Sequence, residues 1–100
     1  MYVYFVLYIG LQKVFNSCPN LLQVHLRRCS EVDDDCVMTL AQNCGCLEVL
    51  NLHGCEKVSG VGLIGLATNS KYLECLDLTR TQVSQHTYVY AFAIACKCAV

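Results

Sequence analysis

Cysteine and histidine are the side chains of this sequence that could bind a transition metal or act as nucleophiles. Nine cysteines and three histidines occur among the 100 residues, and His53 and Cys55 lie two positions apart. Structural zinc sites favour pairs of cysteines with two to four residues between them. The close pairs here, Cys44–Cys46 and Cys96–Cys98, have only one residue between them. We therefore predict no metal site and no cofactor.

Catalysis by a side-chain nucleophile is not indicated either. A cysteine–histidine pair needs a third group that orients the histidine, and none is recognisable beside His53 and Cys55. Asp33, Asp34 and Asp35 could suggest a divalent-metal cluster, but consecutive residues at the start of a helix point in different directions. A capping aspartate followed by acids that the helix dipole stabilises explains them better. We expect no catalytic residue and no enzyme activity.

Most of the cysteines belong to an internal repeat. Residues 18–43 align without a gap on residues 44–69 at an offset of 26, so that Cys29 falls on Cys55. A third copy over 70–95 drops one residue in its turn and is degenerate towards its end. The apolar positions that keep the register are Leu21, Leu47 and Leu73; Val24, Leu50 and Leu76; and Leu26, Leu52 and Leu78. The thiols are therefore positions of a repeating architecture and not parts of a site.

Each copy reads L-x-x-L-x-L-x-x-C followed by a short helical pattern, which is the leucine-rich-repeat signature. Alternating leucines predict strands with one buried face, and apolar residues at helical spacing predict helices. We expect strands over 21–26, 47–52 and 73–78, and helices near 35–43 and 61–69. A single copy cannot bury its apolar face alone. The predicted fold is therefore an α/β leucine-rich-repeat solenoid of about three 26-residue repeats, with parallel strands on the concave face and helices on the convex face.

Polar residues mark the two ends of each predicted helix. Asp33, Ser59 and Ser84 precede the helical stretches, where a side-chain oxygen can accept a backbone N–H. Asn43 and Asn69 end them, and asparagine tolerates the left-handed turn that closes many helices. We expect capped helices in each copy.

Two further expectations concern the turn that follows each strand. Cys29 and Cys55 should be buried and reduced, because the position needs a small side chain that bonds weakly to the turning backbone; Thr81 fills it in the third copy. Position 53 is held by Arg27 in the first copy and by Thr79 in the third. We therefore expect His53 to be an exposed and variable residue.

The chain is one domain at most, or a fragment of one. Residues 10–17 resemble the remnant of an earlier repeat helix, and 1–9 and 88–100 are hydrophobic ends outside the repeat. Because 55% of the residues are hydrophobic and the net charge is −1, we expect no general attraction to nucleic acid or anionic membranes. The apolar runs are shorter than the ~18–20 residues of a spanning helix, and no export signal is recognisable. We expect free thiols in the cytoplasm or nucleus.

Residues between the strand leucines should face the concave side and vary from copy to copy. Rigid scaffolds commonly place binding residues at such positions, and a mixture of donors, acceptors and one acid suits a protein surface. The predicted partner-binding residues are Gln23, His25, Arg27, Arg28, Val49, Asn51, His53, Cys75, Asp77, Thr79 and Arg80.

Other interpretations stay open. The same residues can be plain solvated strand positions. Arg27, Arg28 and Arg80 could bind nucleic acid, although no aromatic platforms accompany them. The apolar ends could associate with a membrane. Finally, the chain could be a truncated repeat fragment without a function of its own.

Two stretches carry a resemblance to a known family. NLHGCEKVSGVGLIGLATN, residues 51–69, and CLDLTRTQVS, residues 75–84, resemble the cysteine-containing leucine-rich repeats of F-box/leucine-rich-repeat proteins, with the closest likeness to the antagonist of mitotic exit network protein family. The likeness covers about residues 10–87. It implies a horseshoe-shaped binding protein linked to substrate recognition in SCF-type ubiquitin ligases or to cell-cycle regulation. No F-box is visible, so recruitment of the Skp-type adaptor is not expected.

Overall fold

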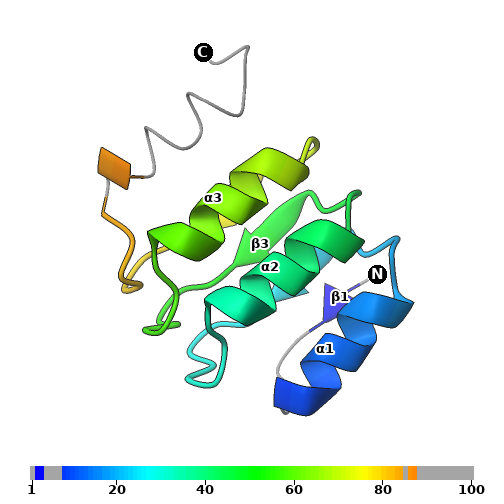
Figure 1. Cartoon of the computed structure of the whole chain (residues 1–100), viewed down its shortest axis with the longest axis horizontal. Coiled ribbons are helices and arrows are strands. Elements are labelled where there is room, and N and C mark those ends of the chain that lie inside the picture. Colours follow the sequence, from blue (N-terminus) through cyan, green and yellow to red (C-terminus); the bar gives the residue numbers. More distant parts are fainter. Residues whose placement is uncertain (1, 4–7, 85, 88–100) are drawn as a thin grey trace.

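Strands and helices alternate along the chain. The computed structural model describes residues 2–3, 8–84 and 86–87, and the side chains from residue 13 onwards. Four parallel strands form one sheet in the order β1-β2-β3-β4 (Figure 1). The elements are β1 (Tyr2–Val3), α1 (Tyr8–Ser17), β2 (Gln23–His25), α2 (Asp34–Asn43), β3 (Val49–Asn51), α3 (Gly60–Asn69) and β4 (Cys75–Asp77).

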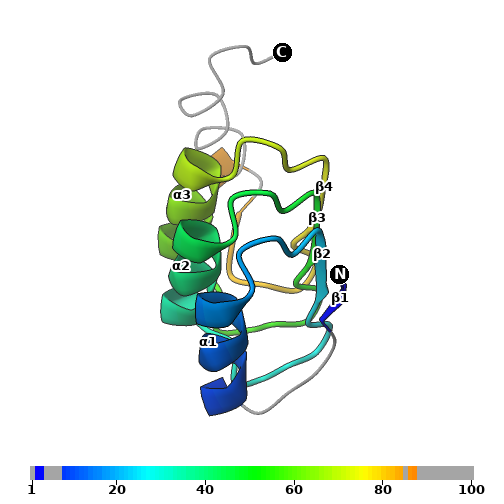
Figure 2. The same ribbon diagram turned by 90° about the vertical axis from the view of Figure 1, so that its right-hand side faces the viewer.

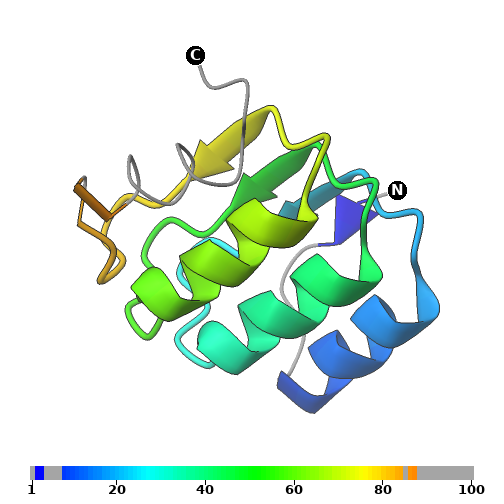
Figure 3. The ribbon, with the colours of Figure 1, turned by 45° about the horizontal axis from the view of Figure 1, so that its top comes forward.

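The strands and the helices form two layers. Figure 2 shows α1, α2 and α3 in one layer and the four strands in the other. In Figure 3 the three helices lie side by side across the same face of the sheet, each beside the helix that precedes it in the chain. The opposite face of the sheet is not covered by any described element, and we call it the open face.

The register of the sheet reproduces the repeat. Val24, Leu50 and Leu76 are partners on three adjacent strands, each 26 positions from the next. The strands lie inside the predicted ranges but are three residues long rather than six. The two predicted helices are confirmed, and each begins one residue earlier than expected. The parallel sheet and the α/β class are therefore confirmed.

The core fills the space between the two layers. The repeated apolar residues of the first two copies are buried: Leu21, Val24, Leu26, Leu47, Leu50 and Leu52 are each at most 1% exposed. Their counterparts in the third copy, Leu73, Leu76 and Leu78, are only half-buried. This difference arises because, within the described residues, the third copy has a neighbouring unit on one side only.

The predicted caps at the helix starts are confirmed, and both helices end at the predicted asparagines, but without the expected left-handed turn. Asp33 Oδ1 accepts a hydrogen bond from the Cys36 N–H at 3.0 Å, and Ser59 Oγ accepts one from the Val61 N–H. The predicted left-handed closure at Asn43 and Asn69 is wrong. Both residues lie inside their helices, and each side-chain amide donates 2.8 Å to the carbonyl four residues earlier. That bond occupies a backbone acceptor of the last turn.

The amino-terminal end contains structure that the repeat pattern did not predict. Residues 2–3 form β1, which pairs in parallel with β2, although 1–9 lie outside the repeat. The helix expected over 10–17 begins at Tyr8. The whole hydrophobic stretch at 88–100, with the pair Cys96–Cys98, lies outside the described residues. Among the described helices, none is long and apolar enough to cross a membrane.

Candidate functional site

The open face carries rows of side chains that cross the strands. Gln23, Val49 and Cys75 are register partners and form one row. The next row on this face is His25, Asn51 and Asp77. None of these six side chains is buried in the core, because each alternates along its strand with a core residue. The structure therefore brings the predicted strand residues onto one surface.

The remaining predicted residues lie in the turns that leave the strands. Arg28, Gly54 and Arg80 occupy equivalent positions, and all three have left-handed backbones with φ of 61°, 78° and 62°. The turns are joined by backbone hydrogen bonds: the Arg28 N–H donates to the His53 carbonyl at 2.6 Å, and the Gly54 N–H donates to Thr79 at 2.8 Å. The turns thus stack in the same register as the strands.

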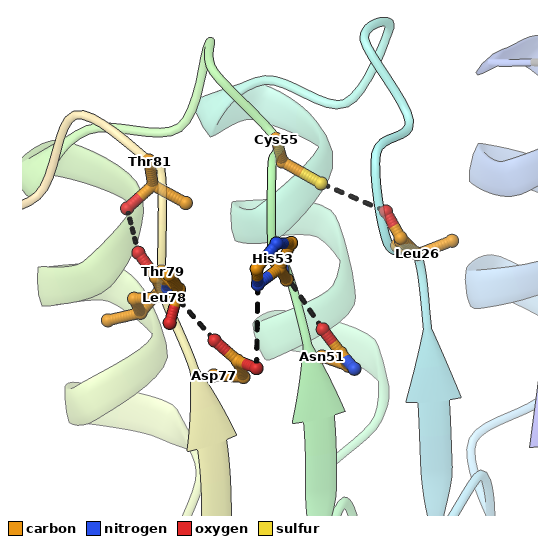
Figure 4. Close-up of polar contacts among 8 residues, drawn as sticks. All are labelled: Leu26, Asn51, His53, Cys55, Asp77, Leu78, Thr79 and Thr81. Carbon is orange, nitrogen blue, oxygen red and sulfur yellow. Dashed lines mark hydrogen bonds and ion pairs between the residues drawn. The ribbon is translucent and has the colours of Figure 1, made fainter.

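A polar network holds the centre of the open face. Asn51 Oδ1 accepts from the His53 N–H at 2.9 Å, and Asp77 Oδ1 accepts from the Thr79 N–H at the same distance (Figure 4). His53 Nδ1 lies 3.9 Å from Asp77 Oδ2, which joins two neighbouring units. The expectation that His53 is exposed is wrong, since its side chain is only 16% exposed. The imidazole instead lies beside Asp77 of the next strand.

The electrostatics of this network centre on Asp77. Hydrogen bonds from the backbone and side chain of Thr79 are the main cause of a lowered pKa of the Asp77 carboxyl. Partial burial opposes them, and the charges of His53 and Arg27 lower the pKa further. Asp77 is therefore ionised at neutral pH. Arg27, although two strands away, lies close enough to contribute to the potential at this carboxylate.

The repeated thiols lie on the other side of the sheet from these rows. Cys55 is 0% exposed, and its thiol donates to the carbonyl of Leu26 in the preceding unit at 3.0 Å (Figure 4). In the third unit the Thr81 hydroxyl donates to the Leu78 carbonyl at 2.7 Å. The prediction of a small buried donor at this turn is confirmed. Figure 4 also shows His53 directed towards Asp77, so it does not pair with Cys55.

Burial keeps these thiols protonated. It raises the pKa of Cys55 and of Cys44 to about 11, and that of Cys36 to about 12. A thiol is nucleophilic, or binds a metal, only after it loses its proton. The buried cysteines therefore serve as packing and hydrogen-bonding groups. Among the described residues, no group of three or more His, Cys, Asp and Glu side chains is placed to hold a metal ion.

Two features of the surface were not predicted from the sequence. The first is the left-handed backbone of Arg28 and Arg80, for which Gly54 at the equivalent position is the one signal in the sequence. The second is the role of Asp34, which contacts the following helix rather than its own. Such a contact depends on how two helices approach each other, which the repeat alone does not specify.

The described part of the chain is thus an α/β protein with a small parallel sheet, one face of which presents variable polar residues. No protein-family model matches the chain. It is similar to a transport inhibitor response 1-like protein of Oryza sativa subsp. japonica, with 37% identity over 67 residues. The matched segment is 67% of this chain but 12% of the relative. This match supports a similarity of the leucine-rich-repeat type. It gives no support to the antagonist of mitotic exit network family.

Proposed function

We propose that this chain is a protein-binding part of a leucine-rich-repeat solenoid, and that its partner contacts the open face of the sheet. One observation carries the proposal. Leucines or valine fill the core position at 24, 50 and 76, whereas the neighbouring outward position changes from His25 to Asn51 to Asp77. A constant framework beside a changing surface is the arrangement of a recognition module.

We further propose that the module has no catalytic activity. The thiols of Cys36, Cys44 and Cys55 are buried and protonated. Those of Cys46 and Cys75 are exposed, but among the described residues they belong to no cluster of three or more His, Cys, Asp and Glu side chains that could hold a metal ion. The polar groups of the open face are engaged in a network that fixes the turns, with Asp77 bound by Thr79 and lying near His53. This chemistry suits recognition by hydrogen bonds and charge.

The biological setting that we propose is substrate or regulator recognition in an SCF-type ubiquitin ligase or in cell-cycle control, in the cytoplasm or nucleus. The resemblance of residues 51–69 to F-box/leucine-rich-repeat proteins supports it. The similarity to a transport inhibitor response 1-like protein supports the repeat class. In this proposal the chain binds a substrate or regulator, and it does not bind the Skp-type adaptor.

Affinity capture tests the proposed surface. The wild-type chain is compared as bait with a triple variant, Arg27→Glu, His53→Glu and Asp77→Lys, which alters one strand residue and two turn residues of the open face. The variant changes the net charge by −1 when histidine is neutral. Proteins that bind the open face should be lost from the variant. The variant should keep the circular dichroism of the wild type, because none of the three side chains is in the core.

A matched control alters the helical side of the molecule. Lys13→Glu, Gln42→Glu and Asp35→Lys also change the net charge by −1, at exposed positions on α1 and α2. This control should retain the captured proteins. If it loses them while the open-face variant keeps them, the helices form the binding surface and the proposal is wrong.

A further inference from the structure

Three arginines lie together where the strands leave the sheet: Arg27 and Arg28 after β2, and Arg80 after β4. We call them the arginine edge. We propose that the arginine edge binds an acidic segment of the protein partner, rich in aspartate and glutamate. This proposal rests on the function proposed above and specifies the chemistry of the partner.

The backbone places Arg28 and Arg80 on either side of a gap. Their turns stack on that of Gly54 through hydrogen bonds of 2.6 and 2.8 Å, so they lie two strand spacings apart, roughly 10 Å. Gly54 has no side chain to fill the space between them. The Arg28 side chain leans over this glycine, since a Cβ built on Gly54 would lie 3.0 Å from Arg28 Cγ. A carboxylate near Gly54 would thus lie between the turns that carry Arg28 and Arg80.

The positive charge of this edge is only partly balanced within the described part of the chain, where Arg27 lies close enough to Asp77 to lower the pKa of that carboxyl. Arg27, Arg28 and Arg80 are exposed, and none of them forms an ion pair with a described acidic residue. Asp77 is the acid of the open-face rows, and it is bound by Thr79 and lies 3.9 Å from His53. Guanidinium groups bind carboxylates through paired, charge-assisted hydrogen bonds. The edge therefore offers donors that a partner's carboxylates can use.

Backbone strain provides a second and independent argument. A left-handed backbone costs free energy for every residue with a Cβ, whereas glycine adopts it readily. At position 54 the turn has glycine, the residue that suits a left-handed backbone, whereas positions 28 and 80 have arginine. Strained residues gather at functional sites, where another role compensates for the cost. Two arginines at the two strained positions that flank a glycine point to such a role.

Acidic residues at the amino ends of the strands indicate where on the sheet the acidic segment would lie. Glu48 and Glu74 occupy equivalent positions before β3 and β4, and their backbones are joined by a hydrogen bond of 2.8 Å from the Glu74 N–H to the Glu48 carbonyl. Glu48 and Glu74 thus lie at the amino ends of the strands, whereas the three arginines lie at the carboxyl ends, near Asp77. An acidic segment would be repelled from the first and attracted to the second. We therefore place it across the carboxyl ends, over the stacked turns.

Fluorescence anisotropy with a labelled peptide of alternating glutamate and glycine tests the proposal. The wild-type chain should bind this peptide more tightly than peptides that contain glutamine or lysine in place of glutamate. Arg28→Gly/Arg80→Gly should weaken binding at least about tenfold, because both guanidinium groups are lost. Glycine suits the left-handed turns, so this variant should unfold in urea no earlier than the wild type.

A second double variant controls for net charge. Lys13→Ala/Lys71→Ala also removes two positive charges, but at exposed positions away from the turns, and its affinity should stay within about twofold of wild type. The proposal is overturned if the wild type does not prefer the acidic peptide or if both double variants lose affinity equally. Tighter binding of a single-stranded oligouridine, lost in the arginine variant, would assign the edge to nucleic acid instead. Any of these results would overturn the arginine edge alone. The proposed function would still be supported if the open-face variant lost its captured partners.

Discussion

The carboxylate of Asp34, the first residue of α2, accepts the backbone N–H of Ser59 at 2.8 Å, and Ser59 is the residue that caps α3. The same Asp34 oxygen accepts the Gly62 N–H at 3.0 Å. One unit therefore supplies part of the cap of the next helix, while the adjacent Asp33 caps α2 itself. This contact ties together residues 25 positions apart in the sequence.

Replacement of Asp34 should therefore weaken the contact between two units. We expect Asp34→Ala to lower the free energy of unfolding by about 1–2 kcal/mol, since it removes a cap and leaves helix N–H groups without their acceptor. Asp35→Ala, at an exposed position in the same turn, should change it by less than about 0.5 kcal/mol. Urea unfolding followed by circular dichroism measures both values. Equal losses of unfolding free energy in the two variants would mean that negative charge near the start of the helix stabilises the fold, and not the cap formed by Asp34.

A double-mutant cycle with Gly62 separates the cap from other effects. A Cβ built on Gly62 would lie 2.6 Å from Asp34 Oδ1, so Gly62→Ala should displace the carboxylate. Its cost should be smaller in the Asp34→Ala background than in the wild type, because that background has no carboxylate to displace. Additive effects of the two substitutions would argue against a shared cause.

Core leucines in neighbouring units should differ in their contribution to stability. Leu50 is 0% exposed between units on both sides, whereas its partner Leu76 is half-buried at the end of the described sheet. We expect Leu50→Ala to cost about 2–5 kcal/mol and Leu76→Ala clearly less, because the cavity is larger where the residue is enclosed. Urea unfolding of the two variants compares them. A cost below about 1 kcal/mol for Leu50→Ala would show that this position is not part of a packed core.

Much of this fold could be predicted because its signals are local and repeated. The spacing of Leu47, Leu50 and Leu52, seen again 26 residues earlier and later, specifies strand, burial and register at once. The caps Asp33 and Ser59 are equally local. The strand at Tyr2–Val3 carries no such repeat and was missed. The Asp34 cap was missed because it depends on the approach of α2 to α3, which is a tertiary property.

The candidate surface was predicted in part, for the same reason. Alternation along the strands determines that Asn51 and Asp77 face outwards, and the sheet register brings them together. Alternation does not reveal that His53 leans towards Asp77 and is largely covered. Nor does residue type reveal the left-handed backbone of Arg28 and Arg80, because arginine is not a residue that usually adopts it.

The buried thiols predict how stability depends on alkaline pH. An unfolded thiol titrates near pH 8.5, whereas burial raises the pKa of Cys55 and Cys44 to about 11 and that of Cys36 to about 12. The folded state therefore keeps protons that the unfolded state loses as the pH rises above the unfolded value. The stability contributed by the protonated thiols should be complete at neutral pH and should decline as the pH rises from about 8.5 towards the folded pKa values of about 11 and about 12.

Urea unfolding at a series of pH values checks this dependence. Cys55→Ser retains a small hydroxyl donor, as Thr81 does in the third unit, but it does not titrate in this range. Its stability should fall less steeply between pH 8 and pH 10 than that of the wild type. Alkylation at neutral pH should modify the exposed Cys46 and Cys75 well before the buried thiols. Rapid alkylation of Cys55 in the folded chain would contradict the assigned burial.

Arg80 offers a last test, because its glycine variant should be more stable than its alanine variant, which is the reverse of the usual order of stability. At most positions in regular structure, glycine is less stable than alanine by about 0.5–1 kcal/mol, because it loses more conformational entropy on folding. Arg80 has a φ of 62°, where a Cβ is unfavourable. Arg80→Gly should therefore be more stable than Arg80→Ala by about 1 kcal/mol, although both variants lose the same guanidinium group. Thr79 is exposed and lies beside Arg80 without a positive φ, so Thr79→Gly should instead be less stable than Thr79→Ala. Urea unfolding of the four variants gives both differences. Lower stability of Arg80→Gly than of Arg80→Ala would mean that the turn is not strained, which would remove the strain argument for the arginine edge.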